Sequence, residues 1–61
     1  MPVVIVEMWE GRTVDQKKQL AEGITSAFVK IGVPASALHI IMKDNPKHNW
    51  AMGGKLASES S

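Results

Sequence analysis

The absence of cysteine from a chain of only 61 residues limits how this sequence can fold. A domain of this size buries about 60% of the surface that its unfolded chain exposes, and ordering costs about 1.5 kcal/mol per residue. Small domains usually offset this deficit with disulfides, a structural metal or self-association. Disulfides are excluded here, and with His39 and His48 as the only imidazoles we expect no metal. The sequence therefore predicts a single domain over residues 1–61 that is completed by oligomerisation.

The charge and hydropathy patterns exclude several kinds of partner. Seven Lys and Arg residues against six Asp and Glu residues leave a net charge of +1, and the basic residues are scattered along the chain. Such a pattern lacks the cluster of basic residues that is typical of nucleic-acid binding. The longest apolar run, Val3 to Val6, is far shorter than the ~20 residues of a membrane span, and no secretory signal pattern is present. We therefore expect a cytoplasmic protein that binds neither nucleic acid nor membranes.

Two strands and a hairpin are predicted. Residues 3–9 begin with an unbroken β-branched run, which is typical of a strand covered on both faces. In residues 38–43 the side chains alternate between two faces of a strand, with His39, Ile41 and Lys43 on one face. We expect Asp44-Asn45-Pro46 to end this second strand, and residues 50–54 to form a short extended segment and a tight turn at Gly53-Gly54.

A single main helix is predicted between the strands. Thr13 and Gln16 match the capping box, and Gly32 followed by Pro34 predicts the end. One face carries an apolar stripe at helical spacing, formed by Leu20, Ile24, Ala27, Phe28 and Ile31. The predicted fold class is therefore α+β, a small β-α-β unit with parallel strands and a C-terminal hairpin. Because one helix covers one face of such a sheet, the other face is expected to meet a second copy of the chain.

Pro2 is the residue with the most unusual chemical potential. Methionine before proline is normally removed, which would leave the secondary amine of proline at the N-terminus. Free α-amino groups titrate near ~8, and a desolvated pocket lowers that value. Such an amine can act as a general base near neutral pH. The alternative is an incidental proline ahead of a strand, which the ordinary frequency of proline favours when this residue is taken alone. With Met1 attached, the nitrogen is an amide and cannot act as the base.

The chain resembles the 4-oxalocrotonate tautomerase family over essentially its whole length. The resemblance is carried by Pro2, the Glu10-Gly11-Arg12 turn, the Met52-Gly53-Gly54-Lys55-Leu56-Ala57-Ser58 tail and the length of about 60 residues. It implies a cofactor-free isomerase that interconverts the enol and keto forms of an unsaturated 2-hydroxy or 2-oxo acid. It also implies a homohexamer, a trimer of dimers, with Pro2 as the general acid/base.

The resemblance assigns further roles to positions of this chain. Arg12 would bind a substrate carboxylate, although without the resemblance a solvated turn cation or a partner of Glu10 is the favoured interpretation. Trp9, Trp50 and Met52 would form an apolar wall that favours the uncharged amine, although each is also explained by core or interface packing.

His39 is the main departure from the family pattern, because it stands where the family has a second arginine from a neighbouring subunit. Histidine is mostly neutral at pH 7 and lacks the bidentate fork of arginine. Losing a charge-assisted donor of this kind lowers a rate by roughly 10²–10³-fold. Either His39 is a weakened catalytic donor, with Lys43 or Lys47 as substitutes for the charge, or it is a plain interface residue.

Two other functions stay open. The 3-haloacrylate dehalogenases of the same family add water across a double bond and need a carboxylate near the late aromatic residue, but Trp50-Ala51-Met52 contains none. The other alternative is an oligomeric scaffold or binding module without catalysis, with Met1 retained.

Overall fold

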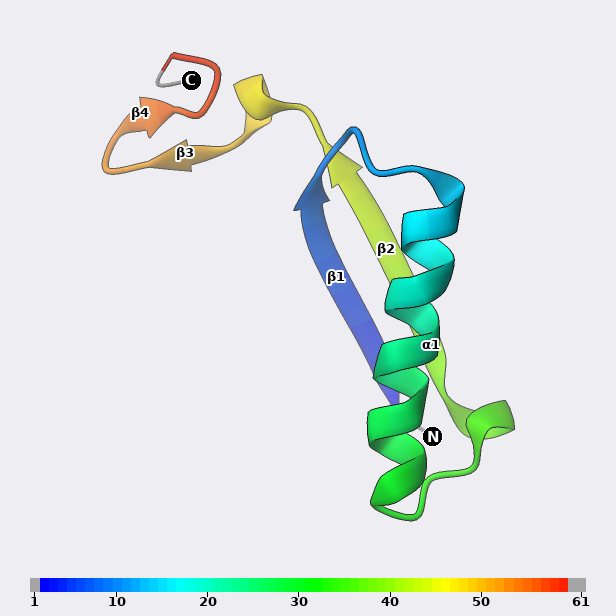
Figure 1. The fold of residues 1–61 in the computed structure, drawn as a ribbon. Helices are drawn as coiled ribbons and strands as arrows, with labels where there is room; N and C mark the ends of the chain where they lie inside the picture. Colours follow the sequence, from blue (N-terminus) through cyan, green and yellow to red (C-terminus); the bar gives the residue numbers. More distant parts are fainter. Residues whose placement is uncertain (1, 60–61) are drawn as a thin grey trace.

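The computed structural model describes residues 2–59 and shows a β-α-β unit followed by a hairpin (Figure 1). Strands β1 (Val3–Trp9) and β2 (His39–Asn45) pair in parallel, from Val3 opposite His39 to Trp9 opposite Asn45. Helix α1 (Val14–Lys30) connects them and lies on one face of the sheet. The predicted fold class, with parallel strands and one main helix, is confirmed.

The two faces of the sheet are covered unequally, because side chains alternate along each strand. Val4 and Val6 point to the face that α1 covers and are half-buried. On the opposite face, Val3, Ile5 and Ile41 remain 54%, 55% and 46% exposed. We call this surface the outer face. Within one chain, the first strand is therefore covered on one face only, although its sequence is apolar on both.

Helix α1 begins and ends at the predicted signals. The Thr13 hydroxyl accepts a hydrogen bond from the Gln16 backbone N–H at 3.1 Å, and the Gln16 side-chain oxygen accepts from the Thr13 backbone N–H at 2.9 Å. At the other end, Gly32 adopts a φ of +97°, and its N–H donates to the Val29 carbonyl. A left-handed residue in this position is a common helix stop.

The apolar stripe of α1 is only partly covered. Ile24 and Phe28 are half-buried on the side of the sheet, whereas Leu20 is 39% and Ile31 is 75% exposed. Ala27 is exposed as well. A sheet of two strands is narrower than this stripe, so a flank of the helix remains uncovered within one chain.

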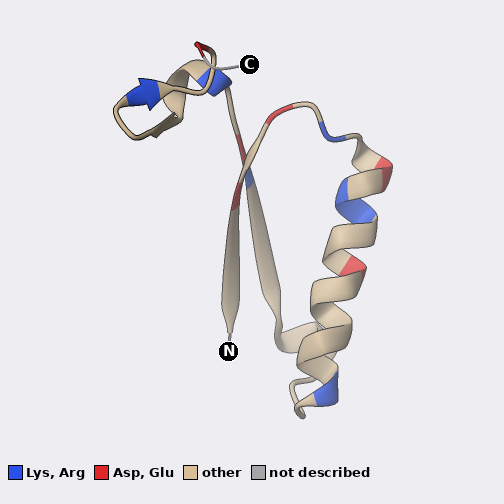
Figure 2. Cartoon of the chain, turned by 60° about the vertical axis from the view of Figure 1, so that its left-hand side comes forward, with Lys and Arg blue, Asp and Glu red and all other residues tan. Residues whose placement is uncertain are grey.

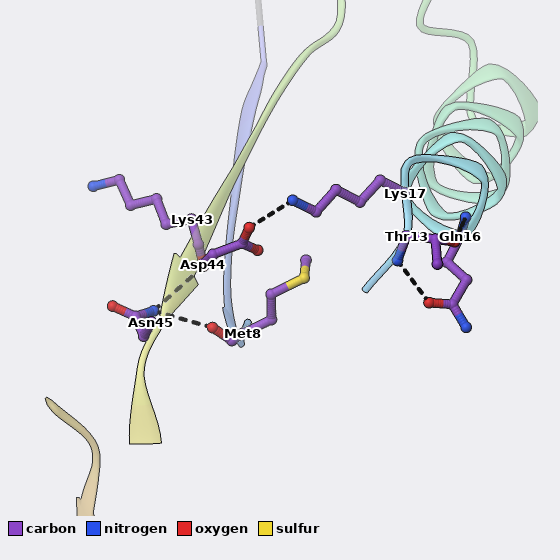
Figure 3. Close-up of polar contacts among 7 residues, drawn as sticks. All are labelled: Met8, Thr13, Gln16, Lys17, Lys43, Asp44 and Asn45. Carbon is purple, nitrogen blue, oxygen red and sulfur yellow. Dashed lines mark hydrogen bonds and ion pairs between the residues drawn. The ribbon is translucent and has the colours of Figure 1, made fainter. Parts of the chain in front are cut away.

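The second strand is longer than predicted. Its pairing continues past Lys43 through Asp44 and Asn45, and Pro46 ends it. The Asn45 side-chain amide stabilises this extension, because it donates to a Glu7 carboxylate oxygen at 2.9 Å. It also donates to the carbonyl of Met8 at 3.3 Å (Figure 3). The prediction that Asp44 and Asn45 break the strand is therefore wrong.

Two short 3-10 helices were not predicted. The first, η1 (Ala35–Ala37), has Pro34 as its N-cap, and the second, η2 (Lys47–Asn49), has Pro46. Proline fixes the extended φ that such a cap adopts, but three residues carry too little periodicity to identify the helix from sequence.

Residues 46–59 form an arm that extends from the end of β2 on the side away from α1 (Figures 1 and 2). It contains η2 and the predicted hairpin, in which β3 (Ala51–Met52) pairs antiparallel with β4 (Lys55–Leu56). The turn uses Gly53 and Gly54 at φ values of +59° and +82°. The N–H of Ala57 donates to the Trp50 carbonyl at 2.7 Å and closes the arm.

A single chain has almost no interior. Among residues 2–59, Ala57 is the one buried apolar side chain. The radius of gyration is 14.6 Å, against about 10.5 Å for a compact chain of this length. The accessible surface is 4631 Å², against roughly 3,900 Å² for a compact monomer of this mass. No helix in this part of the chain combines the length and apolarity needed to cross a membrane.

Candidate active site

Pro2 and His39 lie together at the end of the sheet where both strands begin. The backbone N–H of His39 donates to the carbonyl of Pro2 at 3.1 Å. Alternation places Pro2 on the face covered by α1, where it is half-buried, and places His39 on the outer face with Val3. The two side chains of one chain therefore point to opposite faces of the sheet.

Arg12 lies at the other end of the sheet, in the turn between β1 and α1. It is exposed, and no ion pair links it to Glu10 or to another described carboxylate. Its side chain lines an open groove of about 440 Å³ between β1 and the first half of α1. The other lining residues are Val6, Met8, Gln16, Lys17, Gln19 and Leu20. This groove combines an apolar floor with a cationic rim, a suitable surface for an organic carboxylate.

Lys17 is the second cation of this groove, and it is already paired. Its Nζ lies 2.7 Å from an Asp44 carboxylate oxygen, with side chains that are 30% and 37% exposed (Figure 3). This ion pair joins α1 to the end of β2. Arg12 is therefore the groove cation that remains available to a ligand among residues 2–59.

Trp9 and Trp50 are brought together from opposite ends of the chain. Their ring centroids are 5.7 Å apart at an interplanar angle of 74°, an edge-to-face contact. The Nζ of Lys47 lies 5.0 Å from the centroid of the Trp9 ring. We call Trp9, Lys47 and Trp50 the tryptophan cluster. From the sequence, Lys47 was one of two cations that could replace the charge of the family's second arginine. No sequence pattern predicts that it lies over an indole ring.

Met52 is the last of the residues expected to line the site. It lies on β3 and is 62% exposed. Its apolar surface is therefore uncovered in a single chain.

One chain does not bring all the expected site residues together. Pro2 and Trp9 are separated by the length of β1, which at about 3.3 Å per residue is about 23 Å. Pro2 and His39 occupy one end of the sheet, whereas Arg12 and the tryptophan cluster occupy the other. A site that contains both groups requires residues from more than one chain.

No cluster of three or more His, Cys, Asp or Glu side chains that could share a metal ion occurs within residues 2–59. The polar groups of the candidate site are cations, amides and indoles, which are suited to binding a carboxylate.

Solved structures with the same architecture define the class of this fold. A 4-oxalocrotonate tautomerase from Chloroflexus aurantiacus J-10-fl, described as a heterohexamer, superimposes with a TM-score of 0.88, at 30% identity and 97% coverage of each chain. The Tautomerase family model, described as tautomerase enzyme, matches residues 2–59. The chain belongs to the Tautomerase family.

Curated relatives extend over nearly the whole chain. A protein of Lactococcus lactis named "Probable tautomerase" is 46% identical, with 92% of this chain and 93% of the relative covered. The 2-hydroxymuconate tautomerase of Comamonas testosteroni is 38% identical, with 97% and 95% covered. Membership of this family supports a tautomerase activity, that is, an isomerase.

Proposed function

We propose that this protein is a cofactor-free tautomerase in which Pro2, freed by removal of Met1, is the general acid/base. Its substrate is an unsaturated 2-hydroxy or 2-oxo acid, and 2-hydroxymuconate is the first candidate. The observation that best supports this proposal is the family match, which begins at Pro2 and continues to residue 59. The relative named 2-hydroxymuconate tautomerase supports the choice of substrate.

The proposed reaction moves one proton without oxidation or reduction. The Pro2 amine removes the proton from the enol oxygen, the double bonds shift along the conjugated chain, and the same amine returns the proton to carbon. Arg12 anchors a carboxylate of the substrate through a charge-assisted hydrogen bond. His39 donates a hydrogen bond to the substrate oxygen, as the weakened counterpart of a second arginine.

The proposed site is assembled from several chains. Pro2 comes from one chain, His39 from another, and Arg12 from the opposite end of the sheet of a further chain. These residues meet where copies of the sheet contact one another. The separation of Pro2 from Trp9 within one chain supports this arrangement, and so does the scarcity of buried apolar residues. We propose a homohexamer, a trimer of dimers. The heterohexameric neighbour supports an assembly of this size.

The apolar wall keeps the proline amine uncharged. Trp9, Trp50 and Met52 present indole and thioether surface with no carboxylate among them. A desolvated surrounding disfavours the protonated amine and lowers its pKa, which leaves more of the free base near neutral pH. The lack of a carboxylate also argues against the water addition of a dehalogenase.

Ketonisation of 2-hydroxymuconate, followed by ultraviolet absorbance, tests the proposal. We expect Pro2→Ala to lower the rate about 10²–10⁴-fold, the usual contribution of a positioned general base. Pro34→Ala is the matched control, because Pro34 precedes η1 and its nitrogen is an amide; its rate should stay close to that of the parent protein.

The N-terminus of each protein is checked by mass, and the assembly by native mass spectrometry. Equal, slow rates for the parent and Pro2→Ala, with Met1 absent from both, would contradict the general-base role. A stable monomer would contradict the shared site.

A further inference from the structure

Lys47 is held at the entrance of the arm by its neighbours. It is the first residue of η2, directly after Pro46, and the proline fixes the direction in which the chain leaves β2. Its Nζ lies 5.0 Å from the centroid of Trp9, and Trp9 contacts Trp50 edge-to-face. The tryptophan cluster therefore joins β1, η2 and the start of the hairpin around one cation.

The Lys47 ammonium lacks an anionic partner among residues 2–59. The ion pair recorded in this part of the chain joins Lys17 to Asp44. A cation–π contact orients the ammonium but leaves its N–H donors without an acceptor. Lys47 is exposed, so this oriented and unpaired ammonium is open to an oxyanion.

The same cluster contains a second donor without an acceptor. The Trp9 indole N–H is shielded from solvent and has no hydrogen-bond partner within residues 2–59. A shielded donor is destabilising unless it is satisfied. A carboxylate offers two oxygens, and it accepts from both an ammonium and an indole N–H only where the indole N–H has been uncovered.

Lys43 differs from Lys47 in each of these respects. It lies on β2, opposite Glu7 in the sheet register, and alternation places it on the outer face. Figure 3 shows its side chain extending from β2 to the side opposite the Asp44–Lys17 pair. Within residues 2–59, its ammonium lies over no aromatic ring. The structure therefore separates the two cations that the sequence left as alternatives.

We propose that Lys47 binds a carboxylate of the substrate, with the conjugated carbon chain against the face of Trp50. This inference rests on the proposed function. It adds a second cationic side chain to the site, in addition to Arg12. It also selects for substrates with two carboxylates, one for Arg12 and one for Lys47.

Binding of muconate tests this role without any turnover. Muconate is a conjugated dicarboxylate without the 2-hydroxyl group, so it cannot tautomerise. The chain has two tryptophans, and both lie in the cluster, so the intrinsic fluorescence of the assembled protein reports only on this place. We expect muconate to change the fluorescence, and Lys47→Gln to weaken its binding about tenfold or more.

Two further variants separate charge from structure. Lys43→Gln removes an equal charge from the outer face and should leave muconate binding within about twofold. Lys47→Arg keeps the charge and should retain most of the affinity. Muconate that does not bind, binding unchanged in Lys47→Gln, or equal losses in both glutamine variants would overturn the proposal. So would a loss in Lys47→Gln that is matched by a lower thermal midpoint and not rescued by arginine.

Turnover of 2-hydroxymuconate separates this inference from the proposed function. We expect Lys47→Gln to raise KM with a smaller change in kcat, because the lost contact is made in ground state and transition state alike. Muconate binding that depends on Lys47 in a protein without turnover would support Lys47 and contradict the tautomerase. A Lys47→Gln variant with an unchanged KM and full turnover would support the tautomerase and contradict the role of Lys47.

Discussion

The β-α-β unit and the arm pair the hydrogen-bonding groups of their backbones in different ways. In the unit, strands β1 and β2 pair over their whole length, and the helix between them is capped at both ends. In the arm, β3 and β4 pair over two residues each, and the closing hydrogen bond joins Ala57 to Trp50. Nevertheless, the one buried apolar side chain of residues 2–59 lies in the arm.

This difference shows that local order and hydrophobic burial are separate requirements. The β-alternation, capping box and glycine stop order the unit, but leave its outer face and a flank of α1 exposed. The arm has little regular structure and depends on the Trp9–Trp50 contact for its position. Each region therefore needs surface from other chains, the unit to cover its apolar faces and the arm to hold its place.

The largest effect is expected from a charge on the outer face. Ile5→Asp puts a carboxylate into an apolar surface that we expect to be buried between copies. Burying an unpaired charge is strongly unfavourable, so we expect a loss of more than about 3 kcal/mol and dissociation of the assembly. Native mass spectrometry measures the dissociation, and unfolding followed by circular dichroism measures the loss of stability.

Val14→Asp is the control for this change. Val14 is 75% exposed, more than Ile5, but it lies in the first turn of α1 rather than on the sheet. An aspartate there is favourable near the helix N-terminus, so stability should stay within about 0.5 kcal/mol. Equal losses from both substitutions would show that the outer face has no special role.

Replacing glycine by alanine should change the free energy of unfolding in opposite directions in the two regions. Gly23 lies inside α1 with nothing within 4 Å of an added Cβ, so Gly23→Ala should stabilise by about 0.5–1 kcal/mol. Gly54 has a φ of +82° in the hairpin turn, so Gly54→Ala should destabilise by about 1–2 kcal/mol. Thermal unfolding of both variants measures the difference, and the same sign for both would contradict it.

The smallest effect is expected at the ion pair between α1 and β2. Asp44→Asn removes the partner of Lys17, but both side chains are partly exposed. Such pairs contribute at most about 1 kcal/mol, and salt screens them. We expect a loss of about 0.5 kcal/mol in dilute buffer that disappears near 1 M salt. A loss that salt does not change would point to a hydrogen bond in a dry surrounding instead.

The elements of the unit could be predicted because their signals are local. Thr13 and Gln16 are three residues apart, and the glycine stop follows the last helical turn, so neighbouring residues decide the structure. The end of β2 was wrong because Asn45 is held by Glu7 and Met8, residues far from it in sequence. Side-chain contacts across a sheet override the breaking tendency of Asp and Asn.

The candidate site could be predicted only as a set of residues. The sequence shows which side chains have suitable chemistry, but the places of Pro2, Arg12 and Trp50 depend on tertiary structure. The contact of Lys47 with Trp9 joins an η2 residue to the end of β1. Its geometry depends on the path of the chain after Pro46, which no local pattern specifies.

The near absence of buried side chains within residues 2–59 makes folding a matter of mass action. When the apolar surface of a chain is covered by its own copies, dilution favours the unfolded state as urea or heat does. The thermal midpoint should then rise with protein concentration, and specific activity should fall in very dilute assays and return when the protein is concentrated. Folded protein in the cell would track its expression level, with a lower limit below which the chain has no native structure.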